Sequence, residues 1–226
     1  RSSDLSKQKS RVDLVRIAAS INDIDQCYQI ARSLTKLGYK VGLNLMQPND
    51  VPSEEISRIA GVVQKWKTID VLYFADSLGG MNATNVVRII LALKTHWTGE
   101  LGFHAHNNKG LAASNTMVAL ENGATWVDCT ILGMGRGAGN AQTENLLLAL
   151  QEKYQLGFDM DVLFDLVLSD FIPLQKKYHW GEGLLYNLAA INNIHPTYIQ
   201  EMLVEGRYSN KEILKAIDFM APLNTK

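Results

Sequence analysis

His104 and His106 are two histidines separated by one residue, and they are the clearest candidates for a reactive site in this sequence. They end the short apolar run 101–103, and Asn107 and Asn108 follow directly. Since side chains alternate across a strand, histidines at i and i+2 project from the same face, where two imidazoles can bind one metal ion. A metal usually needs a further ligand, commonly a carboxylate. The pair predicts a metal site with a third ligand elsewhere, and a purely hydrogen-bonding role is the alternative.

The glycine-rich segment 133–140, Gly-Met-Gly-Arg-Gly-Ala-Gly-Asn, precedes a helical pattern that begins near Thr143. Glycines before a helix let backbone N–H groups approach an anionic oxygen, although a simple turn would have the same composition. The segment lacks the Lys-Ser/Thr pair of a phosphate-binding loop. We therefore expect it to face a carboxylate or an enolate rather than a nucleotide phosphate.

Three other polar residues, Arg16, Asp76 and Ser77, also lie within or directly after apolar runs. The segment from Asp76 to Gly80 has the composition of a turn, but its position also places a carboxylate and a hydroxyl at a strand end. A buried Arg16 would need an anionic partner. A substrate carboxylate, Asp76 or Asp128 could each supply it.

The elements that position these residues follow a repeating pattern of a short apolar run and then a segment with helical spacing. The runs cover residues 12–18, 41–46, 71–76, 101–106 and 126–131. This alternation predicts βα units and a parallel sheet, and reactive residues in such folds gather at the carboxyl ends of the strands. The spacing, and the absence of GxGxxG after the first run, favour a (β/α)8 barrel over a doubly wound sheet.

Beyond residue 156 the pattern becomes purely helical. Helices are predicted over residues 161–177, 183–192, 196–205 and 210–220. We expect residues 1–156 to be part of a barrel and residues 157–226 to be a helical C-terminal extension packed on it, since no linker separates the two.

Composition excludes several classes of protein. Lys and Arg number 22 against 23 Asp and Glu, so no net charge favours nucleic acid or an anionic membrane. No apolar stretch approaches the about 20 residues that cross a bilayer. Two cysteines, Cys27 and Cys129, are too few for a disulfide framework. A cytoplasmic protein is expected.

Four motifs, in this order and spacing, resemble those of the 4-hydroxy-2-oxovalerate aldolases. These enzymes belong to the TIM-barrel metallolyase superfamily that includes hydroxymethylglutaryl-CoA lyase. The motifs are Val-Arg-Ile-Ala at 15–18, Tyr-Phe-Ala-Asp-Ser-Leu-Gly-Gly-Met at 73–81, Gly-Phe-His-Ala-His-Asn-Asn at 102–108 and Gly-Met-Gly-Arg-Gly-Ala-Gly-Asn-Ala at 133–141. The resemblance covers roughly residues 12 to 155, and it implies that the five runs are barrel strands 4 to 8.

The resemblance implies a divalent-metal-dependent lyase that cleaves a 4-hydroxy-2-oxo acid to pyruvate and an aldehyde. Mn²⁺ or Mg²⁺ would be bound by His104, His106 and an aspartate of the first barrel strand, with Asn140 as a further ligand in the lyase branch. The implied catalytic residues are Arg16 and Tyr186. The implied substrate-binding residues are Asp76, Ser77, Asn108 and Gly135.

Two departures from the family pattern qualify this expectation. The first-strand motif Asp-x-Thr-Leu-Arg-Asp-Gly, which carries the metal aspartate, is absent from the chain. We expect a longer protein rather than one that has lost the chemistry, because five parallel strands with open edges make a poor isolated domain. In the tail, the family's catalytic tyrosine maps to Glu182 or Tyr186, depending on the register.

Other functions and partners remain open from the sequence. One alternative is an acyl-CoA-dependent lyase or synthase of the same superfamily, and another is a catalytically silent module that binds a 2-oxo acid. A small-molecule substrate is the expected partner, and a homo-oligomer is compatible with a barrel. An aldehyde dehydrogenase accepts the product of the resembling aldolases, but the tail here does not support that partnership.

Overall fold

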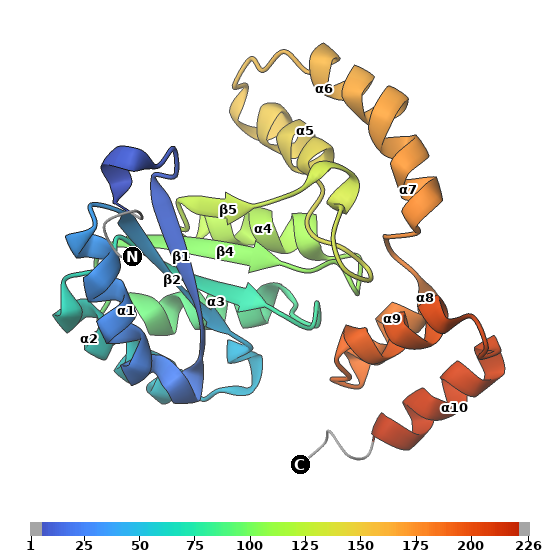
Figure 1. Ribbon diagram of the computed structural model, residues 1–226, viewed down its shortest axis with the longest axis horizontal. Coiled ribbons are helices and arrows are strands. Elements are labelled where there is room, and N and C mark those ends of the chain that lie inside the picture. The colour runs from blue at the N-terminus through green and yellow to red at the C-terminus, as the bar shows by residue number, and fades with distance from the viewer. Residues whose placement is uncertain (1–5, 222–226) are drawn as a thin grey trace. The chain divides into compact units, whose positions relative to one another are not determined.

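The computed structural model describes residues 6–221, and strands and helices alternate through its first two thirds (Figure 1). The alternation confirms an α/β fold. The elements are β1 (Leu14–Ser20), α1 (Ile24–Lys36), β2 (Lys40–Met46), α2 (Ser53–Trp66), β3 (Val71–Asp76), α3 (Ala83–Lys94), β4 (Glu100–Ala105), α4 (Ala112–Glu121), β5 (Trp126–Asp128) and α5 (Thr143–Tyr154).

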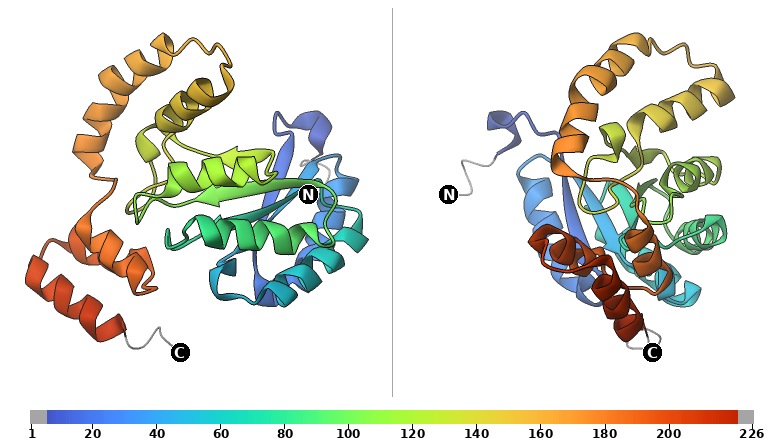
Figure 2. Two further views of the ribbon diagram at one scale, coloured as in Figure 1. Left: turned by 180° about the vertical axis from the view of Figure 1, so that it is seen from behind. Right: turned by 90° about the vertical axis from the view of Figure 1, so that its right-hand side faces the viewer.

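The strands form one five-stranded sheet in chain order. β1 pairs with β2 and β2 with β3 in parallel, and the arrows of β3, β4 and β5 point the same way in Figure 1. α1, α2 and α3 lie on one face of the sheet (Figure 2). α2 buries Ile56, Ile59, Ala60 and Val63, a spacing that places all four on one side of a helix. Helical spacing after each strand therefore predicted these helices correctly.

The core of the sheet leaves little room around β4. The rings of Phe74 and Phe103 pack with centroids 4.7 Å apart. A Cβ atom on Gly102 would lie 2.4 Å from the ring of Tyr73, so only glycine fits there. This close approach lets Tyr73 and the last residues of β4 pack side by side.

The bounds of two predicted strands differ from the observed ones by two or more residues, and those of β2 and β4 differ by one. β1 begins at Leu14, two residues later than predicted, and β5 ends at Asp128 rather than at residue 131. Residues Ile131–Gly133 form a 3-10 turn instead. The backbone N–H of Thr130 donates to the oxygen of Ala141, and Thr130 forms an isolated parallel bridge with Gln142.

The C-terminal part is helical, as predicted, with one interruption. Its helices are α6 (Asp161–Leu166), α7 (Ile172–Tyr178), α8 (Leu184–Ile191), α9 (Pro196–Glu205) and α10 (Asn210–Met220). A π-helical turn, Val167–Phe171, separates α6 from α7 where one helix was predicted. Pro173, the second residue of α7, has no N–H to donate, which accounts for the irregularity.

Within the described residues, the chain divides into two compact units that interleave in sequence. One contains residues 6–76, 84–103 and 119–127, and the other contains residues 77–83, 104–118 and 128–221. The second unit has its own apolar cluster, built from Ala138 of the glycine-rich segment and from Tyr186, Ala189, Ile194, Ile199, Ile213 and Ile217. None of the helices within residues 6–221 is long and apolar enough to span a membrane.

Candidate metal site

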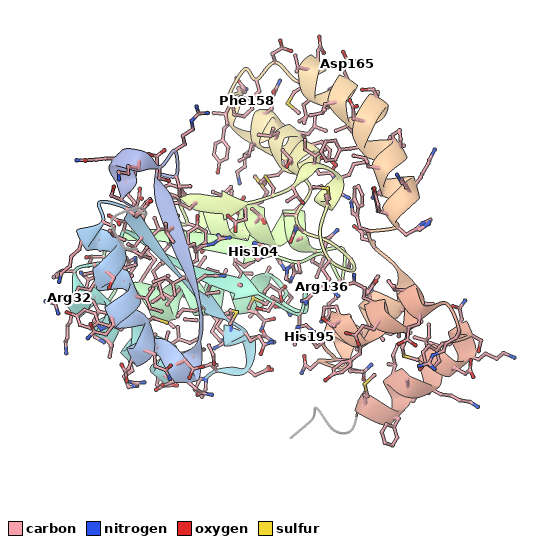
Figure 3. The ribbon with its side chains drawn as sticks, in the orientation of Figure 1. Arg32, His104, Arg136, Phe158, Asp165 and His195 are labelled. Carbon is pink, nitrogen blue, oxygen red and sulfur yellow. The ribbon has the colours of Figure 1, made fainter. Side chains whose placement is uncertain are left out.

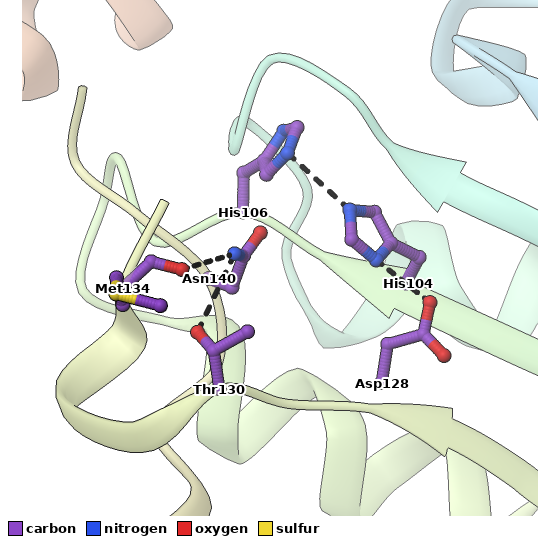
Figure 4. Close-up of polar contacts among 6 residues, drawn as sticks. All are labelled: His104, His106, Asp128, Thr130, Met134 and Asn140. Atoms are coloured by element: carbon purple, nitrogen blue, oxygen red, sulfur yellow. Dashed lines mark hydrogen bonds and ion pairs between the residues drawn. The ribbon is translucent and has the colours of Figure 1, made fainter. Parts of the chain in front are cut away.

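The two histidines project from the end of β4 toward a common point (Figure 4). The Nε2 atoms of His104 and His106 lie 3.3 Å apart, and their ring planes cross at 81°. His104 is the fifth residue of β4 and His106 follows its last residue. The alternation of side chains along the strand therefore places both imidazoles on the same side, as predicted.

The other ring nitrogen of each histidine has a fixed hydrogen-bonding partner. Nδ1 of His104 lies 2.9 Å from Oδ2 of Asp128, and Nδ1 of His106 lies 2.8 Å from the backbone oxygen of Ser77. Both partners are acceptors, so each Nδ1 carries a proton, and in a neutral ring Nε2 presents a lone pair. Such partners orient histidines that bind metals.

When both rings are neutral, two lone pairs face each other across 3.3 Å. Two acceptors at that distance repel unless a proton or a cation lies between them. Burial, followed by the charge of His104, lowers the pKa of His106 to about 4, so this ring is neutral near pH 7. A neutral imidazole is the form that binds a metal, and the pair therefore fits a divalent cation.

Asn140 reaches the histidines from the glycine-rich segment. Residues His106 and Asn140 form an isolated antiparallel bridge. The Asn140 Nδ2 donates to the backbone oxygen of Met134 at 3.1 Å and lies 3.5 Å from Oγ1 of Thr130. These contacts fix the amide, and Figure 4 shows its oxygen on the side of His106.

The glycines of this segment are required by close approaches within it. A Cβ on Gly135 would lie 2.5 Å from Nδ2 of Asn140, and one on Gly139 would lie 2.0 Å from the backbone oxygen of Gly133. Gly133, Gly137 and Gly139 all have positive φ. The segment is therefore a tightly folded loop that positions Asn140, and Gly135 contacts that side chain directly.

Three consecutive residues of the tail, 180–182, contact this loop, the residue before it and the end of β4. Nε1 of Trp180 donates to Leu132 O at 2.9 Å, and the N–H of Gly181 donates to Gly137 O at 3.0 Å. Nδ2 of Asn107 donates to Glu182 at 2.5 Å. We refer to residues 180–182 as the tail strap.

The two asparagines after the histidines differ in their surroundings. Asn107 is buried, and its Oδ1 accepts from the N–H of Ala112 at the start of α4. Asn108 is also buried, and its side chain packs against Gly79. Its Nδ2 has no hydrogen-bond partner within the described residues. Asn107 thus has a structural role, while the amide nitrogen of Asn108 is left to donate.

Tyr186 lies in α8 beside the glycine-rich loop. Its ring approaches Gly137, where an added Cβ would lie 3.1 Å from the ring, and the residue belongs to the apolar cluster of the second unit. Burial raises the pKa of its hydroxyl. The hydroxyl therefore stays protonated near pH 7 and can donate a hydrogen bond.

Arg16 and Asp76 belong to the other compact unit. The Arg16 guanidinium lies 4.6 Å from the centre of the Tyr73 ring and is exposed, so the predicted buried cation was wrong. Asp76 is buried at the end of β3. Ser77, in the second unit, contacts His106 through its backbone oxygen rather than its hydroxyl.

Within residues 6–221, no group of three or more His, Cys, Asp or Glu side chains forms a complete metal site. The sequence reasoning missed the contact between Asp128 and His104. The one feature of the sequence that could have indicated this contact is the position of Asp128 at the end of the neighbouring strand.

Comparison with known proteins agrees with these features. Residues 2–169 match the family described as HMGL-like. A 4-hydroxy-2-oxovalerate aldolase of Carboxydothermus hydrogenoformans is 36% identical over 165 residues, which cover 73% of this chain and 49% of that protein. The one of Pelotomaculum thermopropionicum is 38% identical over 155 residues, or 68% and 45% of the two chains. The chain thus spans about half the length of the curated relatives it matches.

Two solved structures illustrate the shared fold. The N-terminal domain of a proposed aldolase from Bacteroides vulgatus has a TM-score of 0.80 and 32% identity, covering 91% of this chain and 67% of that one. The HMG-CoA lyase of Bacillus subtilis has a TM-score of 0.63 at 20% identity, covering 77% and 66%. The second likeness concerns the fold alone.

Proposed function

Because this chain belongs to the HMGL-like family, we propose that it is part of a divalent-metal-dependent carbon–carbon lyase. Its substrate is a 4-hydroxy-2-oxo acid and its products are pyruvate and an aldehyde. The observation that carries the proposal is the histidine pair, whose Nε2 atoms face each other at 3.3 Å. The Nδ1 atom of His104 is hydrogen-bonded to Asp128, and that of His106 to the backbone oxygen of Ser77.

The proposed metal ligands are His104, His106 and the side-chain oxygen of Asn140, and the ion is Mn²⁺ or Mg²⁺. The family resemblance supplies a further aspartate from the first barrel strand. A bound divalent cation polarises the 2-oxo group and stabilises the negative charge that develops when the carbon–carbon bond breaks. Asp128 and the backbone oxygen of Ser77 hold the imidazoles in the ligating tautomer.

The remaining roles belong to other residues of the chain. Tyr186 is the proposed acid/base group, because its ring packs against Gly137 of the glycine-rich loop. Arg16 is the proposed catalytic cation. Asp76, Ser77, Asn108 and Gly135 are the proposed substrate-binding residues, and the unpartnered Asn108 Nδ2 supports this for Asn108.

We propose further that β1 to β5 are strands 4 to 8 of a (β/α)8 barrel, and that residues 157–226 are a helical extension packed on it. The parallel pairing of β1, β2 and β3 in chain order supports the barrel. A cytoplasmic location and a homo-oligomer complete the proposal. The strap contacts of residues 180–182 support a close association of the extension with the barrel loops.

The test is pyruvate release from 4-hydroxy-2-oxovalerate by the full-length protein, with metal content measured on the same sample. We expect release that stops on chelation, returns with Mn²⁺ or Mg²⁺, and is lost in His104→Ala. The exposed histidine His96 provides the matched control, His96→Ala, which should retain activity. Release that survives both chelation and His104→Ala would refute the proposal. Consumption or release of acetyl-CoA would instead identify an acyl-CoA-dependent enzyme.

A further inference from the structure

A second pair of nitrogen-bearing side chains lies in the same unit as the histidine pair. Nη2 of Arg136 and Nε2 of His195 are 3.4 Å apart (Figure 3). Arg136 lies in the glycine-rich loop, four residues before Asn140, and His195 is the residue before α9. Neither residue has a role in the proposed function.

The protonation of His195 makes this contact unfavourable as it stands. Its Nδ1 accepts from the N–H of Thr197 at the start of α9, so in the neutral ring the proton is on Nε2. Burial and then the charge of Arg136 lower the pKa of His195, which keeps the ring neutral near pH 7. In the tautomer whose Nδ1 accepts from Thr197, two N–H groups face each other, and an acceptor beside them would bind to both.

The backbone holds the two side chains in place. The N–H of Gly139 donates to the backbone oxygen of Arg136 at 3.0 Å, which closes the loop tip. His195 lies between Ile194 and Pro196, which are both buried. Ile194 and Ala138 belong to the same apolar cluster, so the loop and the corner before α9 are packed together. A site formed by this pair is therefore preorganised.

Arg136 lies in the glycine-rich loop that also carries Asn140, a proposed metal ligand, and both residues belong to the same compact unit as His106. The Arg136 guanidinium is a cation, and it repels a nearby divalent cation unless an anion offsets its charge. Within residues 6–221, no carboxylate forms an ion pair with Arg136. An anionic group from a ligand would supply the missing charge.

We propose that Arg136 and His195 form a subsite for a second acidic group of the substrate, a carboxylate or a phosphate. This inference rests on the proposed function, in which the metal site takes the 2-oxo acid end of the molecule. The subsite then takes the opposite end, which becomes the aldehyde product. Arg136 offers the planar pair of N–H donors that suits carboxylate and phosphate oxygens.

The test compares two ligands of equal chain length with the metal-loaded full-length protein by calorimetry. 2-Oxoglutarate carries the second carboxylate and 2-oxopentanoate lacks it. We expect 2-oxoglutarate to bind about 10- to 100-fold more tightly, the range for a charged hydrogen-bonded contact. Arg136→Ala and His195→Gln should each reduce this preference, and Arg136→Lys should restore part of it. Arg207→Ala, which removes an exposed cation paired with Glu205, should leave it unchanged.

Inorganic phosphate distinguishes the two acidic groups. Phosphate binding that depends on Arg136, without a preference for 2-oxoglutarate, would assign the subsite to a phosphate. If neither ligand binding nor phosphate binding depends on Arg136, the subsite is refuted. Pyruvate release from 4-hydroxy-2-oxovalerate, which has no second acidic group, is measured separately. If pyruvate is not released but anion binding depends on Arg136, the lyase proposal is refuted and the subsite proposal is supported.

Discussion

Asp128 and the backbone oxygen of Ser77 determine which nitrogen each histidine presents. The His-x-His spacing predicted that the two rings share a face, and the Nε2 atoms indeed meet. It did not predict the orientation of the rings. Asp128 is separated from His104 by 24 residues. The partner of His106 is the backbone oxygen of Ser77, and every residue type has such an oxygen, so the sequence does not identify it. Orientation thus depends on tertiary structure alone.

Replacing the carboxylate of Asp128 tests this at the level of one residue. Asp128→Asn keeps the volume but weakens the hydrogen bond that fixes His104, so we expect Mn²⁺ to bind about 10- to 100-fold more weakly. Calorimetric titration of the full-length protein measures this. Asp165→Asn, at an exposed position of α6, is the control and should bind Mn²⁺ normally. Equal affinity of the two variants would contradict the orienting role.

At the scale of elements, the glycine-rich loop is a folded structure rather than a flexible turn. The sequence indicated that it precedes a helix, and α5 does begin at Thr143. The reason for its glycines emerged only from packing, because Gly139 approaches Gly133 and Gly135 approaches Asn140. A composition that suits a turn also suits such a compact loop, and sequence alone does not separate them.

Gly139→Ala should strongly destabilise the protein. Its φ is +79°, and the added Cβ would lie 2.0 Å from Gly133 O. The left-handed backbone alone costs about 1–2 kcal/mol for a non-glycine residue, and the backbone clash adds to this. Gly157→Ala is a matched control, with φ +65° and nothing within 4 Å of the added atom. Denaturant unfolding should show the greater loss for Gly139→Ala. Equal losses would show that the loop shifts freely.

The contact between Asn107 and Glu182 couples the end of β4 to the tail strap. A double-mutant cycle of Asn107→Ala and Glu182→Ala should give a coupling free energy of about 0.5–3 kcal/mol, because the residues touch directly. Unfolding of the four proteins in denaturant measures it. Pairing Asn107→Ala with Glu201→Ala, at an exposed position of α9, should give additive effects. A coupling near zero for the first pair would mean that the strap is not held there.

At the scale of the whole molecule, the histidine pair, Asn140 and the tail strap all belong to one compact unit. The sequence predicted a barrel segment followed by an extension. That division stays a prediction. The two compact units interleave along the chain, and the last residues of β4 and β5 belong to the second unit. Burial and contacts decide such a division, and a boundary drawn along the chain does not contain that information.

Metal binding should therefore stabilise one part of the protein first. We expect Mn²⁺ to raise the melting temperature of the full-length protein, with a gain of about 2.7 kcal/mol at a free metal concentration 100 times Kd. Hydrogen exchange should slow most in residues 104–118 and 128–140. His104→Ala should lose both effects. Uniform protection across residues 6–221 would argue against a site confined to this unit.

The tail strap also has an evolutionary consequence. Trp180 donates to the backbone oxygen of Leu132, just before the glycine-rich loop, Gly181 donates to that of Gly137 within it, and Glu182 accepts from Asn107. A tail taken from a relative would have to bring donors and an acceptor that fit the same loop. The loop and the strap are therefore expected to be inherited together, so that substitutions in one are accompanied by substitutions in the other.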